Sequence, residues 1–250
     1  MKIKKAIAVL ILLLISILAL PRNAYAASVK MSNIPQLKTF IAKGHNGGTL
    51  GPIQIVQGSL FKDGTSFQTV YLIALSGTEL EAKDQATDIW TDIKSGFELD
   101  SPYLQAVINA IVNNIPKNSN LIISGHSLGG MIAQQLSGNS KIKDNYNIKN
   151  VITLGSPLIN PFGREGTVQR LGDIADFVPY LSATGTVLLP WQVFGLNREN
   201  GGYSDPMEAH KKSYLRDDVW GKYDMLGFKN GKSYLEYDDA NVKFYKAPIK

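Results

Sequence analysis

The 250-residue sequence contains no cysteine and only three histidines, His45, His126 and His210. The missing cysteines exclude disulfides, thiolate metal ligands and a thiol nucleophile, so a hydrophobic core must hold the chain together. The three histidines show no His-Glu-x-x-His or other paired spacing, and they do not indicate a histidine-based metal centre. We therefore expect an active protein that uses neither a metal nor another cofactor.

The sequence also lacks an apolar run of the roughly 20 residues that cross a bilayer. Its longest run covers residues 6–20, 15 residues in which Ser16 is the one polar residue. Lysines precede this run, and an Ala-Tyr-Ala tripeptide ending at Ala26 follows it. This order predicts a secretory signal peptide over residues 1–26 and a secreted or periplasmic protein after cleavage near Ala26. An uncleaved membrane anchor is the alternative. Residues 27–250 are expected to form a single domain.

The chain has almost no net charge once this segment is removed. The formal net charge of +5 includes four basic residues and no acidic residue from positions 1–26. The remainder has 22 basic against 21 acidic residues. No basic stripe interleaved with aromatics is present, so we expect no nucleic-acid partner. The sequence does not identify any protein partner.

The chemistry is indicated by residues 121–136, LIISGHSLGGMIAQQL. A short apolar run precedes Gly-His-Ser-Leu-Gly at 125–129, and a helix-like stretch follows it. Gly-x-Ser-x-Gly between a strand and a helix is typical of a nucleophile elbow. The glycines suit a turn that is too tight for a Cβ, and Ser127 would lie at a helix N-terminus, where negative charge is favoured. Ser127 is therefore the candidate nucleophile.

Periodicity predicts alternating strands and helices along the rest of the chain. We expect a helix capped at 32–33 and ending near residue 43, a helix beginning at 101–102, and strands at 53–58, 67–75, 121–123 and 151–154. Residues 221–250 are expected to add edge strands. Alternation of this kind predicts an α/β fold with a mostly parallel central sheet and helices on both faces.

A serine nucleophile needs a general base, and the base needs an orienting carboxylate. In this architecture the triad follows the chain order Ser, Asp or Glu, His, and His210 is the one histidine after Ser127. His45 precedes the serine in a Gly-rich stretch and reads as a loop residue. His126 occupies a variable position of the elbow, and we expect its side chain to point away from Ser127 into the scaffold.

The acid must lie between Ser127 and His210. The candidates are Asp144, Glu165, Asp173, Asp176, Glu199, Asp205 and Glu208. Asp173 and Asp176 stand where a strand could end beside the elbow. Sequence physics alone leaves these two equally placed.

Six segments give the chain a resemblance to the lipase class 3 family of α/β hydrolases over roughly residues 67–215. They are SGT at 76–78, DIWTDI at 88–93, GHSLGG at 125–130, TLGSP at 153–157, DFVPYL at 176–181 and EAHKKSYL around His210. The resemblance implies an α/β-hydrolase fold. It also implies that Asp176 is the triad acid, and that Thr78 and the Leu128 N–H form the oxyanion hole.

The expected function is that of a secreted lipase or esterase, a serine hydrolase that cleaves carboxylic acyl esters of lipids, with transient contact to a lipid surface. One alternative is a phospholipase A1-type enzyme or toxin. An alternative of another class is a lipase-like protein that binds lipid or protein without turnover. The segment 79–89 is polar for a lipid-exposed lid, which predicts weak interfacial activation. Residues 187–196 are apolar and are either buried core or a lipid-facing surface.

Overall fold

The computed structural model describes residues 28–44, 50–63, 66–77, 100–159, 162–181, 193 and 195–247. Several of the expectations above lie outside the described residues. These are the signal peptide at 1–26, His45, the oxyanion residue Thr78, the polar segment 79–89 and most of the apolar segment 187–196.

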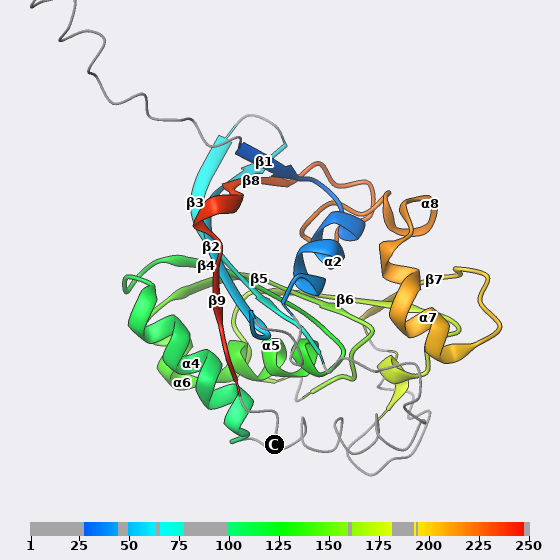
Figure 1. The fold of residues 1–250 in the computed structure, drawn as a ribbon, viewed down its shortest axis with the longest axis horizontal. Coiled ribbons are helices and arrows are strands. Elements are labelled where there is room, and N and C mark those ends of the chain that lie inside the picture. The colour runs from blue at the N-terminus through cyan, green and yellow to red at the C-terminus, as the bar shows by residue number, and fades with distance from the viewer. Residues whose placement is uncertain are drawn as a thin grey trace, which may run out of the picture.

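The described part of the chain forms one nine-stranded sheet (Figure 1). The strand order is β1-β8-β2-β3-β4-β5-β6-β7, and β9 also pairs with β2. The strands are β1 (Ser28–Met31), β2 (Ile53–Lys62), β3 (Ser66–Leu75), β4 (Asn120–His126), β5 (Asn147–Leu154), β6 (Thr167–Asp173), β7 (Leu196–Glu199), β8 (Tyr234–Asp238) and β9 (Lys243–Tyr245).

The sheet has a parallel half and an antiparallel half. Strands β3 to β7 run parallel to one another. Strand β2 is antiparallel to β3, β8 and β9, and β1 is antiparallel to β8. The parallel half holds the strand–helix alternation that the periodicity predicted. The expectation of edge strands in 221–250 is wrong for β8, which lies inside the sheet between β1 and β2.

Helices cover both faces of the sheet. They are α2 (Ile34–Ala42), α4 (Pro102–Asn114), α5 (Leu128–Gly138), α6 (Ser140–Lys143), α7 (Pro206–Lys212) and α8 (Asp217–Trp220), with 3₁₀ turns η1 (Val178–Tyr180), η3 (Ser213–Leu215) and η4 (Asp239–Asn241). In Figure 1, α4 and α6 lie on one side of the sheet and α2 and α8 on the other. Among the described residues, no helix has the length and apolar character needed to cross a membrane.

Each face of the sheet has its own core. Successive side chains of a strand point to opposite faces. On β4, Leu121 and Ile123 pack with α4 and α5, whereas Ile122 packs with α2 and the segment around Trp220. A strand covered on both faces reads as a continuous apolar run, as residues 121–123 do. The α/β-hydrolase fold expected from the sequence, a mostly parallel sheet with helices on both faces, is confirmed.

The helix starts follow capping chemistry. Asn33 accepts a hydrogen bond from the Gln36 N–H at 3.0 Å and caps α2. Ser101 accepts one from the Leu104 N–H at 3.2 Å and caps α4, with Pro102 as the first helical residue. These side chains satisfy N–H groups that have no partner inside the helix. Both starts agree with the sequence prediction.

Candidate active site

Ser127 stands at the turn between β4 and α5 and has a strained backbone. Its φ is +54° and its ψ is −124°, a combination that side-chain-bearing residues rarely adopt. The strain is held by the packed strand before it and the helix after it. The Ser127 N–H donates to the Leu154 carbonyl at 3.0 Å, which ties the turn to the end of β5. The side chain makes no capping bond to α5, so its hydroxyl is not engaged by the helix that it begins.

The elbow glycines leave no room for a side chain. A Cβ at Gly125 would lie 2.3 Å from the backbone of Gly129, and one at Gly129 would lie 2.2 Å from the Leu75 carbonyl oxygen. Both distances are far below van der Waals contact, so β3, β4 and α5 can approach this closely only without these carbons. The same closeness brings the chain after β3 against the candidate nucleophile, since a Cβ at Gly77 would lie 2.9 Å from the Ser127 Cβ.

Asp176 and His210 form a buried pair. The His210 Nδ1 lies 2.9 Å from Asp176 Oδ2 and 3.1 Å from Oδ1. Their side chains are 0% and 1% exposed. Because an ionised carboxylate only accepts hydrogen bonds, Nδ1 is the protonated nitrogen. The Nε2 atom of His210 is then the proton acceptor, and it is buried without a hydrogen-bond partner among the described residues.

Two further donors orient the carboxylate of Asp176. The Tyr214 hydroxyl donates to Oδ2 at 2.7 Å, and the Val178 N–H donates to Oδ1 at 2.9 Å. Burial, and then the neighbouring Asp176, raise the pKa of Tyr214 well above its ordinary value, so this hydroxyl stays protonated. The carboxylate therefore cannot rotate away from the imidazole without losing three hydrogen bonds.

Gly155 connects the elbow to the Asp176–His210 pair. It follows Leu154, whose carbonyl holds Ser127, and its φ is +55°. A Cβ at this position would lie 2.7 Å from Asp176 Oδ2 and 3.1 Å from His210 Nδ1. The glycine thus allows the carboxylate and the imidazole to lie against the backbone that carries the serine turn. The Ser127 turn and the Asp176–His210 pair thus both lie against the same short segment, Leu154 and Gly155 at the end of β5.

Asp173 is as buried as Asp176 but has different partners. It accepts hydrogen bonds from the N–H groups of Ala175 and Gly201, both at 2.8 Å, and from the Ser213 hydroxyl at 2.5 Å. No hydrogen bond or ion pair joins Asp173 to His210 in the described structure. Asp173 therefore binds loops together, whereas Asp176 contacts the imidazole.

None of the other carboxylates between Ser127 and His210 is hydrogen-bonded to His210 in the described structure. Asp205 caps α7, Glu208 pairs with Lys212, and Glu165 accepts from the Ile148 N–H. Glu199 pairs with two lysines, and Asp144 ends the short helix α6. Among the seven candidates, Asp176 is the one that the described structure brings to His210.

His126 is buried, as expected from the sequence, and its side chain contacts His210. Its ring lies against the His210 ring, with centroids 4.6 Å apart, and its Nε2 is 3.0 Å from the His210 carbonyl oxygen. Burial, Lys38 and His210 lower the pKa of His126 well below its ordinary value, so it is neutral. No local motif marked this contact, because it joins residues 84 positions apart.

Lys38 of α2 is a second group that sequence reasoning did not single out. It is 8% exposed, and burial lowers its pKa to about 8, although Asp176 opposes the shift. It lies close enough to Asp176 and His126 to act electrostatically on both. A lysine at a helix position between apolar neighbours normally reaches solvent, so its burial could be recognised only in the folded chain.

One of the two expected oxyanion donors is described. Leu128 is the first residue of α5, where the backbone N–H has no partner inside the helix and the helix dipole favours an anion. Thr78 lies outside the described residues, but the Gly77 before it contacts the elbow. Among the described residues, no group of three or more His, Asp or Glu could hold a metal ion.

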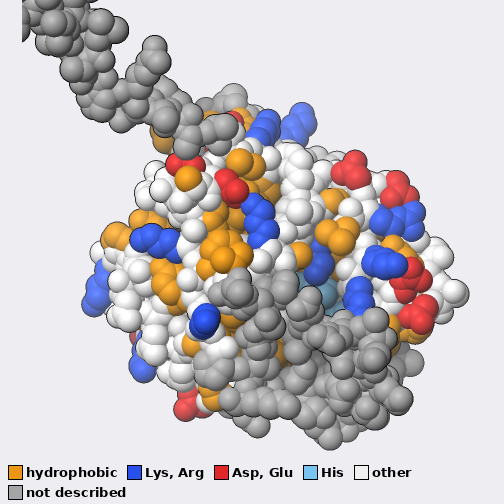
Figure 2. Space-filling view, in the orientation of Figure 1, with side chains coloured by type: hydrophobic (Ala, Val, Ile, Leu, Met, Phe, Trp, Pro, Cys, Tyr) orange, Lys and Arg blue, Asp and Glu red, His pale blue; other side chains and the backbone are white. Residues whose placement is uncertain are grey.

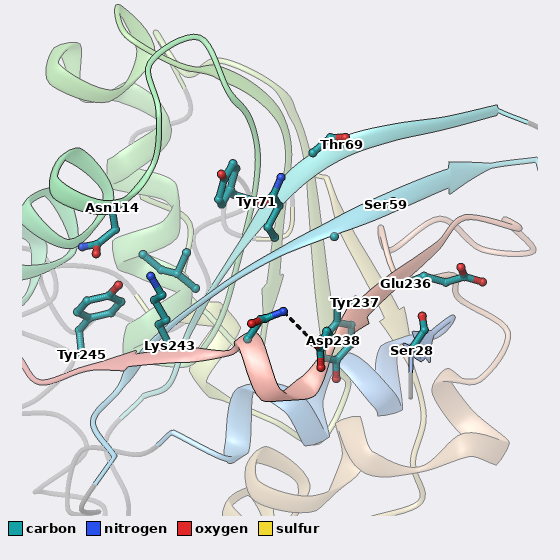
Figure 3. A pocket seen from close by; sticks show the side chains of 14 residues that line it. Ser28, Ser59, Thr69, Tyr71, Asn114, Glu236, Tyr237, Asp238, Lys243 and Tyr245 are labelled. Carbon is teal, nitrogen blue, oxygen red and sulfur yellow. Dashed lines mark hydrogen bonds between the residues drawn. The ribbon is translucent and has the colours of Figure 1, made fainter. Parts of the chain in front are cut away.

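A cavity of about 650 Å³ lies away from these residues, over the antiparallel half of the sheet (Figure 3). Its wall includes Tyr71, Asn114, Lys243 and Tyr245, and it includes none of Ser127, Asp176 and His210. On the face drawn in Figure 2, Lys and Arg are scattered among acidic and hydrophobic side chains and do not form one stripe.

Comparisons with known proteins concern the fold. A family model described as a PGAP1-like alpha/beta domain matches residues 96–174, which include the elbow and end two residues before Asp176. No curated protein matches the chain. The fold and this match support a hydrolase.

Two solved structures are similar to parts of the chain. The crystal structure of Lip2 lipase from Yarrowia lipolytica is 18% identical, with a TM-score of 0.31, and the match covers 53% of this chain and 61% of that one. Nonglycosylated LIP2 lipase of the same organism is 16% identical, with a TM-score of 0.31, over 62% of this chain and 78% of that one. The chain thus spans about three fifths of the first of these lipases.

Proposed function

We propose that this protein is a serine hydrolase that cleaves carboxylic acyl esters of lipids. The observation that carries the proposal is the buried Asp176–His210 pair, whose Nε2 has no hydrogen-bond partner among the described residues. The strained turn at Ser127 bonds to Leu154, and the next residue, Gly155, lies against this pair. A nucleophile, a base and an orienting acid on converging loops are the parts that acyl transfer requires. The α/β-hydrolase fold and the PGAP1-like match are consistent with this chemistry.

In the acylation step, the Ser127 Oγ attacks the ester carbonyl carbon while Nε2 of His210 accepts the hydroxyl proton. Asp176 keeps Nδ1 protonated and stabilises the imidazolium that forms. The N–H of Leu128 and the backbone or hydroxyl of Thr78 bind the tetrahedral oxyanion. His210 then returns the proton to the departing alcohol, and the acyl group remains on Ser127.

In the deacylation step, water replaces the alcohol. His210 removes a proton from the water as the oxygen attacks the acyl carbon, and the same oxyanion donors bind the second tetrahedral intermediate. The intermediate collapses to the free carboxylic acid, and Ser127 recovers its proton from His210. The cycle uses only side chains and backbone N–H groups of this chain, together with water.

Membership of the lipase class 3 family and export from the cell belong to the same proposal. The six ordered segments and the contact between Asp176 and His210 support the first. The basic start, the apolar run at 6–20 and the Ala-Tyr-Ala ending at Ala26 support the second. The substrate is then an acyl ester or lipid outside the cytoplasm, with a phospholipid ester as the alternative substrate.

The proposal is tested by assaying the purified protein on p-nitrophenyl esters of rising chain length, then on triglyceride and phosphatidylcholine. We expect hydrolysis of short and medium esters, and stoichiometric labelling by a fluorophosphonate. An inert protein that resists the label would instead support a lipase-like binding protein. Because the segment 79–89 is polar, we expect little jump in rate as tributyrin passes its solubility limit. A sharp jump with little activity below that limit would favour a lipase activated at interfaces.

A further inference from the structure

We propose that His126 is a positioning residue that fixes the separation between the serine turn and the histidine base. The proposal rests on the proposed function, since it assigns His210 the role of base. His126 is the covalent neighbour of Ser127, and its side chain reaches the backbone of His210. It therefore joins the two elements by a path that does not pass through the triad hydrogen bonds.

The contact has two components. The first is the hydrogen bond between His126 Nε2 and the His210 carbonyl oxygen, at 3.0 Å. A carbonyl oxygen only accepts, so Nε2 of His126 must carry the proton. The second is the packing of the two rings, whose centroids lie 4.6 Å apart at an interplanar angle of 32°. The hydrogen bond fixes the backbone of the base, and the ring contact fixes the plane of its imidazole.

The surroundings hold His126 in this state. The residue is 9% exposed, and Tyr214 presents its ring edge-on to the His126 ring at 5.8 Å. Tyr214 also donates to Asp176, so both sides of the Asp176–His210 pair are supported by residues outside the triad. Burial and the nearby Lys38 disfavour a second positive charge here, which keeps His126 neutral beside the imidazolium that catalysis creates.

The need for this contact follows from where His210 lies. His210 belongs to α7, a seven-residue helix on the surface layer, whereas Ser127 lies at the sheet. A helix this short has little stability of its own and must be held by tertiary contacts. Directly after α7, the Ser213 hydroxyl donates a hydrogen bond to Asp173. His126 holds α7 in the same way at His210 itself, through the hydrogen bond to its carbonyl oxygen. A displacement of a catalytic group by about 1 Å can lower a rate by about 100-fold.

Two substitutions separate the components. His126→Phe keeps a ring for packing and removes the donor, whereas His126→Gln keeps a donor and removes the ring. We expect His126→Phe to lower kcat by 10- to 100-fold with KM within threefold, and to slow fluorophosphonate inactivation equally. His126→Gln should restore at least a tenth of the wild-type kcat. His45→Phe, a change at the remaining histidine, is the control and should leave both rates unchanged.

Wild-type kcat and inactivation rates in folded His126→Phe would overturn the proposal. So would a His126→Gln variant as impaired as His126→Phe, because restoring the donor would then restore no activity. If His210→Ala retains full activity, the proposed function fails instead, and the two failures are thus distinct. A test without a His126 variant is ¹⁵N NMR of the histidine-labelled protein, with His45→Phe as an assignment aid. A neutral Nε2–H tautomer from pH 5.5 to 8 is required, and an Nδ1–H tautomer or a titrating His126 would contradict the proposal.

Discussion

Two regions of the sheet differ in how their polar side chains are arranged. Over the antiparallel half, the cavity of about 650 Å³ is lined by polar and charged side chains such as Gln57, Thr69 and Lys243. These side chains reach solvent from an ordinary sheet face. At the carboxyl ends of β4, β5 and β6, Asp176 and His210 are buried and each has directed partners. The arrangement suited to chemistry is therefore in the second region.

The difference reflects the direction of the strands. In the parallel half, successive strands end at the same edge, so the loops after β4, β5 and β6 converge and can bring together residues far apart in the sequence. In the antiparallel half, β2, β8 and β9 end at alternating edges, and their side chains share only a face. Burial with defined partners therefore marks the candidate active site of this protein.

Substituting the proposed nucleophile is the most severe test of this contrast. Ser127→Ala should lower esterase turnover by about 10⁴- to 10⁶-fold, since the covalent route is lost, while the fold is retained. The measurement is the initial rate on a soluble p-nitrophenyl ester, with fluorophosphonate labelling and circular dichroism beside it. Turnover close to wild type in a folded variant would show that the chemistry lies elsewhere.

A comparison of the two buried aspartates sharpens the contrast within the second region. Asp176→Asn should lower kcat by about 10⁴-fold, because the amide no longer holds His210 in the tautomer that accepts the serine proton. Asp173→Asn should leave most of the activity and lower the free energy of unfolding by about 1–3 kcal/mol, since an amide nitrogen would face hydrogen-bond donors. Rates and urea unfolding of both variants give the answer, and the reverse pattern would exchange their roles.

The buried Lys38 is expected to make the free energy of unfolding depend on pH within a defined range. Burial lowers its pKa to about 8, below the value of about 10.4 for an unfolded lysine. Below pH 8 the residue is charged in both states, and the cost of burying that charge is fully present. As the pH rises from 8 to 10.4, the folded protein holds fewer protons than the unfolded chain, and this cost disappears.

We therefore expect Lys38→Met to raise the free energy of unfolding at pH 7 by about 1–3 kcal/mol, and the gain to shrink toward pH 10. Urea unfolding at several pH values measures it. Lys43→Met at the end of the same helix is the control, because Lys43 is exposed and pairs with Asp239, and its effect should be small at every pH. A Lys38→Met variant that is destabilised throughout would mean that attraction to Asp176 outweighs burial.

The smallest effect on activity is expected from substitutions in the cavity over the antiparallel half of the sheet. Gln57→Ala and Lys243→Ala both remove exposed side chains from the cavity wall, and each should change kcat/KM by less than about twofold. The assay is the same soluble ester, followed by the best lipid substrate. A loss of more than tenfold on the lipid alone would place the cavity on the path of the substrate and erase the contrast.

The elements that could be predicted from the sequence are those with local signals. The caps at Asn33 and Ser101, the apolar run at 121–123 and the turn at Ser127 are local, and the structure has the elements there. Strands β1 and β7 were missed because four residues with mostly exposed or half-buried side chains carry no apolar alternation. Their pairing is decided by neighbours that are distant in the sequence.

The candidate site divides in the same way. Ser127 became a candidate through its motif and His210 through chain order, and both signals can be read along the sequence. The choice between Asp173 and Asp176 could not be made from the residues themselves, because each follows or ends the same strand. Only the tertiary partners separate them. The contacts of His126 and Lys38 are tertiary as well, and composition or spacing gives no sign of them.

The position of β8 bears on how the chain folds. Ser28 of β1 pairs with Asp238, and Gly58 of β2 pairs with Tyr237, so this strand enters between two partners that precede it by most of the chain. Contacts between such distant residues form slowly, because the intervening chain must first be ordered. Until β8 arrives, β1 has no partner and one edge of β2 stays unpaired, a condition that invites association with other chains. We therefore expect β8 to insert late in folding, and a chain shortened before residue 234 to expose the edge that β8 closes.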